Sequence, residues 1–432
     1  MDKYDKPNLD EYENLLNTFG SPLYVYFQNL IVENAQNFIN TFKKYFPTFQ
    51  QYFAVKATPN VHILTLLKNT GMGFDCSSLG ELELINQLAN SDQFAEPIKI
   101  MYTSNFTSIE DFEILLKETL NNNLEIIINL DDIDGLENLH QASVNVNICL
   151  PKMISFRLNP LFGPSESEVE SNILGGADTK FGIPSSKIVD AYKLAIQMGF
   201  RKFGIHMMTG SCILDINYFK NLVDIVFEHI KKINDEVGIK FDFVDLGGGI
   251  GIPYKPNEKK INIESLAKTI YDSINENKHK YKIDYDISIY MENGRYITGP
   301  YGLLLTRCKS IKTGYNDKKF YGLDASMANL MRPGMYGAYH KITVPRLESV
   351  AEFAVESANV VGTLCENNDW FAKNRELPIG IIKNDIFVIH DVGAHGYSMG
   401  FQYNNKLRSA EILINDSDQA VLIRKKETKA FG

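Results

Sequence analysis

The feature that most limits the possible folds is a regular alternation of strand-like and helix-like segments between about residues 31 and 298. Short apolar runs alternate with stretches whose apolar residues recur every three or four positions, as in buried strands and amphipathic helices. The strand-like runs cover residues 52–57, 73–78, 98–105, 124–130, 153–159, 201–208, 241–245 and 287–292. Eight such units predict an α/β fold, a (β/α)8 TIM barrel. A doubly wound open sheet is the alternative, although it does not usually need eight units.

The pattern of apolar and polar residues changes after about residue 300. Short strand-like runs alternate there with turn-rich loops, and helix periodicity is scarce; the runs are Gly302–Leu305, Phe320–Leu323, Phe353–Ser357, Ile386–Ile389 and Ala420–Ile423. This pattern predicts a C-terminal all-β domain, residues 299–432, after a barrel of residues 31–298. No linker rich in Pro, Gly or Ser marks the boundary.

Composition excludes several classes of protein. The formal net charge of −9 argues against nucleic acid or an anionic membrane as the main partner. Five cysteines form no CxxC pair, so neither a disulfide framework nor a zinc site is indicated. The polar start of the chain is unlike a signal peptide, and no apolar run is long enough to span a bilayer. We therefore expect a cytoplasmic protein that acts on a small molecule.

Polar residues or glycines stand at or near the carboxyl ends of most predicted strands. They are Lys56, Asp75, Asn105, Arg157, His206, Gly247–Gly249 and Glu292. In a barrel these ends open on one face, where catalytic groups collect. A single strand-end lysine would more ordinarily reach solvent, but convergence of all these groups predicts a site.

Three of these groups together suit one cofactor. A lysine in a partly desolvated mouth has a lowered pKa and can form a Schiff base with a carbonyl. The run Gly247–Gly249 offers backbone N–H groups to a phosphate, although a glycine run is more often a tight turn. Glu292 can hold a protonated pyridine nitrogen, its alternative being a structural ion pair with Arg295. Pyridoxal phosphate needs a lysine for its aldehyde, backbone N–H groups for its phosphate and a carboxylate for its ring nitrogen, and these three groups would supply them.

A series of motifs in one order carries a resemblance over most of the chain. They are Tyr52-Phe-Ala-Val-Lys56-Ala, Asp75-Cys-Ser-Ser78-Leu-Gly80-Glu81, Arg157-Leu-Asn159-Pro160, Lys180-Phe-Gly-Ile183, Asp245-Leu-Gly-Gly-Gly249, Glu292-Asn-Gly-Arg295, Arg332-Pro-Gly-Met-Tyr336, Cys365-Glu366 and Tyr403-Asn404. The chain resembles the alanine-racemase-like (fold type III) pyridoxal-phosphate decarboxylases, and among them the diaminopimelate decarboxylases. These convert meso-2,6-diaminopimelate to L-lysine and CO2.

The resemblance implies roles for residues of the barrel. Lys56 should form the Schiff base with the cofactor, and Glu292 should contact its pyridine nitrogen. Other residues implied in cofactor binding are Asp75, Arg157, Met208, Ser211, Gly247, Gly248, Gly249, Asn293, Gly294, Arg295 and His395.

The resemblance also implies a substrate site and a homodimer. Substrate binding falls to Arg295, Arg332, Tyr336, Glu366, His395 and Tyr403. Cys365 resembles the family's proton donor, which comes from the partner subunit, so active sites shared between subunits are expected. Taken alone, Cys365 would read as a buried apolar cysteine and Arg332 as a surface arginine. Residues 1–30 should join the β-domain.

Three positions depart from the family pattern. Met208 stands where a histidine usually stacks on the pyridine ring, and a thioether lacks the polarity of an imidazole. Asn293 replaces a proline, and His395 replaces a tyrosine that contacts cofactor and substrate. These changes concern the identity of the substrate more than that of the cofactor.

Two alternative functions stay open. One is decarboxylation of ornithine, arginine, lysine or carboxynorspermidine by a related enzyme. The other is a catalytically silent homologue that regulates a partner, although such a protein has no chemical reason to keep Lys56, Glu292 and Cys365 together. The pair Arg332 and Tyr336, as a carboxylate-binding site, favours diaminopimelate.

Overall fold

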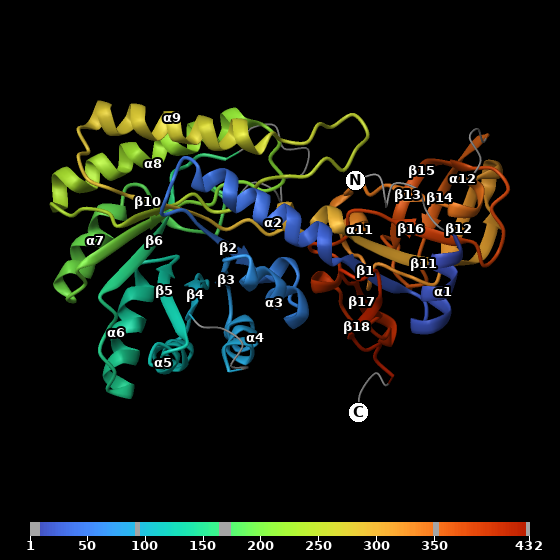
Figure 1. Ribbon diagram of the computed structural model, residues 1–432, viewed down its shortest axis with the longest axis horizontal. Helices are drawn as coiled ribbons and strands as arrows, with labels where there is room; N and C mark the ends of the chain where they lie inside the picture. Colours follow the sequence, from blue (N-terminus) through green and yellow to red (C-terminus); the bar gives the residue numbers. More distant parts are fainter. Residues whose placement is uncertain (1–8, 91–95, 164–173, 349–353, 429–432) are drawn as a thin grey trace. The chain divides into compact units, whose positions relative to one another are not determined.

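The computed structural model describes residues 9–90, 96–163, 174–348 and 354–428 (Figure 1). The chain forms two compact units. One comprises residues 32–252 and 259–297, and the other comprises residues 1–31, 253–258 and 298–432. We call them the barrel unit and the β unit and describe each by itself.

The barrel unit contains a closed ring of parallel strands, which confirms the predicted TIM barrel. Its strands are β2 (Gln50–Ala54), β3 (Gly73–Cys76), β4 (Ile98–Tyr102), β5 (Leu124–Leu130), β6 (Met153–Asn159), β8 (Lys202–His206), β9 (Phe243–Asp245) and β10 (Ser288–Met291). Neighbours pair in that order, β5 pairs β6, and β10 returns to β2. The two-residue strand β7 (Ile183–Pro184) pairs only β6.

Helices follow the strands and lie around the barrel (Figure 1). They are α3 (Val61–Asn69), α4 (Leu79–Ala89), α5 (Ile109–Glu118), α6 (Asp134–Val146), α7 (Ile188–Gln197), α8 (Ile216–Val237) and α9 (Ile263–Tyr281), with α2 (Gln28–Lys43) ahead of β2 and the short α10 (Arg295–Thr298) after β10. Polar side chains cap the first turns of α3, α4, α5, α8 and α9: Asp215, for example, accepts a hydrogen bond from the Asn217 N–H at 2.9 Å.

Most predicted strands end earlier in the structure than in the sequence pattern. Strand β2 stops at Ala54, and residues Val55–Ala57 form a single 3-10 turn. Lys56 therefore lies on a turn beyond the strand rather than at its end. Strand β4 likewise stops at Tyr102, three residues before Asn105. The apolar run continues past the last ladder hydrogen bond because the loop residues are buried too, so hydrophobicity alone overestimates strand length.

The β unit is built on a mixed sheet ordered β15-β14-β12-β11-β1-β17-β18, with β16 pairing β11 and β13. Its strands are β1 (Leu23–Phe27), β11 (Gly302–Thr313), β12 (Lys319–Leu323), β13 (Ile342–Thr343), β14 (Val355–Val361), β15 (Trp370–Pro378), β16 (Ile386–Ile389), β17 (Ala410–Ile414) and β18 (Ala420–Arg424). Short helices α11 (Arg332–Tyr336) and α12 (Pro345–Glu348) connect some of them. Because β1 lies between β11 and β17, the N-terminal residues belong to this sheet.

Helix α1 (Leu9–Phe19) covers part of the same sheet. Its Tyr12, Leu15 and Leu16 pack in a buried apolar cluster with Leu23 and other residues of the sheet. Neither this helix nor strands β15 and β17 was predicted from the sequence. Strand β15 alternates poorly because charged residues interrupt it and its pairing with β14 is irregular. Among the described residues, no helix combines the length and apolarity needed to cross a membrane.

The stability of the β unit should depend on pH through His390. This imidazole interacts with the Thr343 hydroxyl at 2.8 Å, and burial, with Lys341 nearby, lowers its pKa to about 4 from an ordinary 6.5. The unfolded chain then binds more protons between these values, so stability is lost as the pH falls from about 6.5 through 4. We expect a loss of about 2 kcal/mol between pH 7 and 5, absent in His390→Gln. Urea unfolding at both pH values measures it.

The matched control is His140→Gln, on the exposed face of α6. It should keep the wild-type pH dependence. An unchanged pH dependence in His390→Gln would contradict the assignment.

Candidate functional site

A lysine–carboxylate pair stands at the carboxyl end of β2 and β3. The Lys56 Nζ lies 2.6 Å from Asp75 Oδ2 and donates to the Ser77 hydroxyl at 3.2 Å. Asp75 is buried, whereas 50% of the Lys56 side chain is exposed, so the amine stays reachable by a ligand. The predicted lowering of the pKa of this amine is wrong: burial lowers it, but the negative charges of Asp75 and Glu292 outweigh burial and raise it above its ordinary value.

The loop after β9 requires glycine at each of its three positions. Gly247 (φ +65°) and Gly249 (φ +97°) adopt left-handed backbone angles. Gly248 approaches the chain after β10 so closely that an added Cβ would lie 2.5 Å from the Glu292 carbonyl oxygen. The Glu292 N–H in turn donates to the Gly247 carbonyl at 2.8 Å. The glycine run is therefore more than a tight turn: it lets two barrel loops pack backbone to backbone.

Met208 and Arg157 contact this loop region from β8 and β6. The Gly248 N–H donates to the Met208 sulfur at 3.2 Å. Arg157 donates to the Met208 carbonyl at 3.0 Å, pairs with Asp131 at 3.4 Å and lies over the Phe181 ring at 4.5 Å. Arg157 is thus a buried residue that orders the segment carrying Met208.

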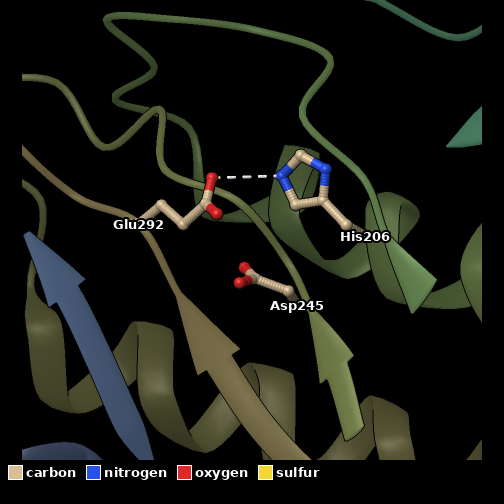
Figure 2. Close-up of side chains that lie close together, drawn as sticks. All are labelled: His206, Asp245 and Glu292. Carbon is tan, nitrogen blue, oxygen red and sulfur yellow. Dashed lines mark hydrogen bonds and ion pairs between the residues drawn. The ribbon is translucent and has the colours of Figure 1, made fainter. Parts of the chain in front are cut away.

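Figure 2 shows a buried trio beside the loop, His206, Asp245 and Glu292. The His206 Nε2 lies 3.1 Å from Glu292 Oε2. Asp245 accepts the Gly247 N–H at 2.8 Å through Oδ1. The structure shows no hydrogen-bond partner for Glu292 Oε1 or for Asp245 Oδ2 within the described residues. The side-chain atoms with which the three residues could bind a metal ion lie within 4.8 Å of one another, so the trio could also hold such an ion.

The two carboxyl groups of the trio differ in charge. Burial would raise the pKa of Glu292, but His206, Lys56 and Arg157 together hold it below its ordinary value. Burial and the charge of Glu292 both raise the pKa of Asp245 well above its ordinary value. Of the two neighbouring acids, Glu292 is therefore the stronger and Asp245 the weaker.

Asn293 replaces the family's proline with an amide that links three strands. Its Nδ2 donates to Gln51 Oε1 at 3.2 Å, and Gln51 donates back to the Asn293 carbonyl at 3.1 Å. Its Oδ1 accepts the Ile250 N–H at 3.3 Å. This buried pair joins the ends of β10 and β2 to the glycine loop, so hydrogen bonds do here what proline's rigidity would do.

The remaining predicted barrel residues flank this group. Gly294 has no room for a side chain, because an added Cβ would lie 2.7 Å from the Ala57 Cβ. Arg295 begins α10 and is partly buried. Ser211 is partly exposed in the loop after β8.

Within the β unit, Arg332 is held in a defined position. It begins α11, is only 7% exposed and lies over the Tyr254 ring at 4.6 Å. It donates to His340 Nε2 at 2.7 Å, and His340 Nδ1 donates to the His390 carbonyl at 2.8 Å. The alternative of an ordinary surface arginine is wrong.

The Cys365-Glu366 segment is exposed in the β unit. The Cys365 N–H donates to the Asn404 side chain at 2.7 Å, and the Tyr403 hydroxyl donates to the Cys365 carbonyl at 3.4 Å. Glu366 accepts the Asn368 N–H at 3.0 Å. The alternative of a buried apolar Cys365 is wrong, since the residue is exposed in this chain.

Two further predicted residues lie in the β unit. Tyr336 ends helix α11 and is partly exposed. His395 is partly buried, with φ +56°. Histidine is among the residues other than glycine that adopt left-handed backbone angles most readily, so this turn can carry it.

Comparison with known proteins agrees with these features. A family model described as "Pyridoxal-dependent decarboxylase, pyridoxal binding domain" matches residues 32–299. The chain belongs to this family. Among curated relatives, protein TabA of Pseudomonas amygdali pv. tabaci is 36% identical, over 98% of this chain and 92% of its own. The diaminopimelate decarboxylase of Methanothermobacter thermautotrophicus is 34% identical, over 96% and 91%.

Solved structures of the family share the fold over nearly the whole chain. Diaminopimelate decarboxylase from M. jannaschii, in complex with L-lysine, gives a TM-score of 0.82 at 30% identity, over 96% of this chain and 92% of that one. The Helicobacter pylori enzyme, also complexed with L-lysine, gives 0.81 at 27% identity, over 96% and 97%.

The residues present fit the family's cofactor, pyridoxal phosphate. Glu292 Oε1 is a buried carboxylate oxygen without a hydrogen-bond partner among the described residues, which suits a protonated ring nitrogen. The glycine loop packs backbone to backbone against the segment that carries Glu292, so a loop of the kind that holds phosphates lies beside this carboxylate. The Lys56 amine lies at the same end of the barrel, as the strand topology requires.

Reasoning from the sequence missed part of this site. Asp245 appeared only within a motif, and His206 only as a polar strand end. The partnership of Gln51 with Asn293 was not foreseen. Two residues far apart in the sequence leave no local signal that they pair, because only closure of the barrel brings them together.

The approach of Gly248 to Glu292 yields a sharp prediction. Gly248→Ala should weaken pyridoxal phosphate binding at least about 10-fold, because the new methyl group would push the loop from the Glu292 carbonyl. Titration of the apoprotein, followed by the visible absorption of the bound cofactor, measures this.

Gly80→Ala, in the first turn of α4, is the matched control, since its Cβ would meet only the Ser78 Oγ at 3.8 Å. It should bind the cofactor as the wild type does. Equal affinity in both variants would show that the loop does not hold the phosphate.

Proposed function

We propose that this protein decarboxylates meso-2,6-diaminopimelate to L-lysine and CO2, the last step of lysine biosynthesis, with pyridoxal phosphate as cofactor. The observation that carries the proposal is that a reachable Lys56 amine and the buried Glu292 carboxylate stand at the same end of the barrel in a chain of this family. Relatives of this name at 34% and 31% identity support the choice of substrate. A cytoplasmic location is part of the proposal.

The barrel residues divide the work on the cofactor. Lys56 would supply the amine that bonds to the aldehyde of the cofactor, and Asp75 holds that amine at 2.6 Å. The glycine loop would hold the phosphate; in this structure the N–H groups of Gly247 and Gly248 donate to Asp245 and to the Met208 sulfur. When bound, pyridoxal phosphate supplies a protonated ring that accepts the electron pair left by departing CO2. Glu292 keeps that ring protonated by staying negatively charged.

The residues of the β unit would select the substrate. Arg332, with the planar fork of a guanidinium, suits a carboxylate, and its anchoring by His340 fixes the direction of the fork. Tyr336 and Arg295 would complete carboxylate binding, and Glu366 would bind the distal ammonium. His395 and Tyr403 would contact the substrate in place of the family's tyrosine.

Protonation of the substrate carbon falls to Cys365 in this proposal. The thiol is exposed in the single chain, as expected of a group that serves the partner subunit's site. The protein would then be a homodimer in which each site needs both subunits.

Release of CO2 tests the substrate directly. We expect single-turnover release from meso-diaminopimelate, with L-lysine as product, and none from L-ornithine, L-arginine or L-lysine. Release from one of the latter instead would contradict the proposed carboxylate site and favour a related decarboxylase. A protein that binds the cofactor but releases no CO2 would be the silent homologue. Lys56→Ala, which cannot form the covalent bond, is the inactive control.

Shared sites predict complementation between inactive variants. Lys56→Ala and Cys365→Ala should each be nearly inactive as homodimers. After subunit exchange, mixed dimers carry one site with both native residues, so activity should return to roughly a quarter of wild type for a random mixture. Steady-state assay of the mixture measures it. No recovery, although mass spectrometry shows exchange, would place both residues in one subunit's site.

A further inference from the structure

The contact between His206 and Glu292 goes beyond the roles assigned so far. Both side chains are buried, and the Nε2 to Oε2 distance of 3.1 Å joins the end of β8 to the residue after β10. These strands are separated in the sheet by β9, whose last residue is Asp245. Figure 2 shows the three side chains converging from these strands.

The imidazole engages only one of the two oxygens of Glu292. Oxygen Oε2 faces His206, whereas Oε1 is buried and has no hydrogen-bond partner among the described residues. A buried carboxylate oxygen left in this state is costly unless a ligand satisfies it. The protonated nitrogen of a pyridine ring, a single N–H donor, matches a single free oxygen.

The third member of the trio has a partner of its own. Asp245 accepts the Gly247 N–H through Oδ1 at 2.8 Å. An asparagine at position 245 could keep this acceptor, so Asp245→Asn separates the charge of Asp245 from its hydrogen bond. The contact that distinguishes Glu292 within the trio is the one from His206.

We propose that His206 is a positioning residue for Glu292: its imidazole holds Oε2 so that Oε1 meets the pyridine nitrogen of pyridoxal phosphate. The inference rests on the proposed cofactor but not on the proposed substrate. It differs from a stacking role, since position 208 carries methionine here and His206 contacts the carboxylate rather than the ring face.

The test compares two ligands that differ only in the ring nitrogen. Equilibrium binding to the apoprotein is measured for pyridoxal phosphate and for its analogue with carbon in place of that nitrogen. His206→Phe should weaken pyridoxal phosphate roughly 10- to 100-fold, the loss expected of a hydrogen bond to a charged group, and leave the analogue unchanged. A merely structural role would weaken both ligands equally, and that result would overturn the proposal.

Further variants keep the test decisive. His206→Gln retains a donor to Glu292 Oε2, so it should bind pyridoxal phosphate almost as tightly as the wild type does. If His206→Phe fails to fold, His206→Gln still allows the two ligands to be compared. Asp245→Asn should keep the preference for the ring nitrogen. His229→Phe, which removes a half-buried imidazole from α8 of the same barrel, is the matched control and should bind both ligands as the wild type does.

Two results would point elsewhere. If the wild type preferred neither ligand, the nitrogen would not meet Glu292, and the inference would fail while the cofactor stood. If the wild type bound no pyridoxal phosphate but held stoichiometric Zn²⁺ that His206→Phe lost, the trio would be a metal site, and both the inference and the proposed function would fall.

Discussion

The closure of the barrel between β10 and β2 is the interaction on which the site depends. These strands pair in parallel register, with Met291 opposite Gln51. Glu292 follows the first strand directly, and Lys56 follows the second on a 3-10 turn. A carboxylate and an amine more than two hundred residues apart thereby reach one end of the barrel. An open sheet of the same strands would leave β2 and β10 without this pairing.

Close packing of the loops after β9 and β10 adds further contacts to those made by the pairing of β10 with β2. Gly248 and the Glu292 carbonyl approach so closely that no side chain fits, and Asn293 extends the contact to Ile250 and Gln51. The backbone of the glycine loop and the carboxylate are thus held by the same contacts. The departure at Asn293 is part of this coupling, because its amide forms hydrogen bonds with groups that closure has already brought near.

The other two departures from the family pattern are Met208 and His395. Met208 donates nothing, but its sulfur accepts the Gly248 N–H, so the side chain is built into the loop. His395 stands on a left-handed backbone in the β unit, at the position of the family's tyrosine. That TabA, a relative without a decarboxylase name, is 36% identical makes a direct test of the substrate worthwhile.

The sequence by itself determined the fold class, because eight apolar runs alternating with amphipathic helices have few other ways to bury their surfaces. It also indicated Lys56, Glu292 and the glycine loop, since each lies near a strand end where local pattern is informative. The tertiary structure alone decided the partners: His206 on Glu292, Gln51 on Asn293, and His340 on Arg332. It also placed Lys56 on a turn and exposed Cys365. Hydrophobic period is a property of neighbours in sequence, whereas a hydrogen bond across a barrel depends on closure and register, which no local pattern records.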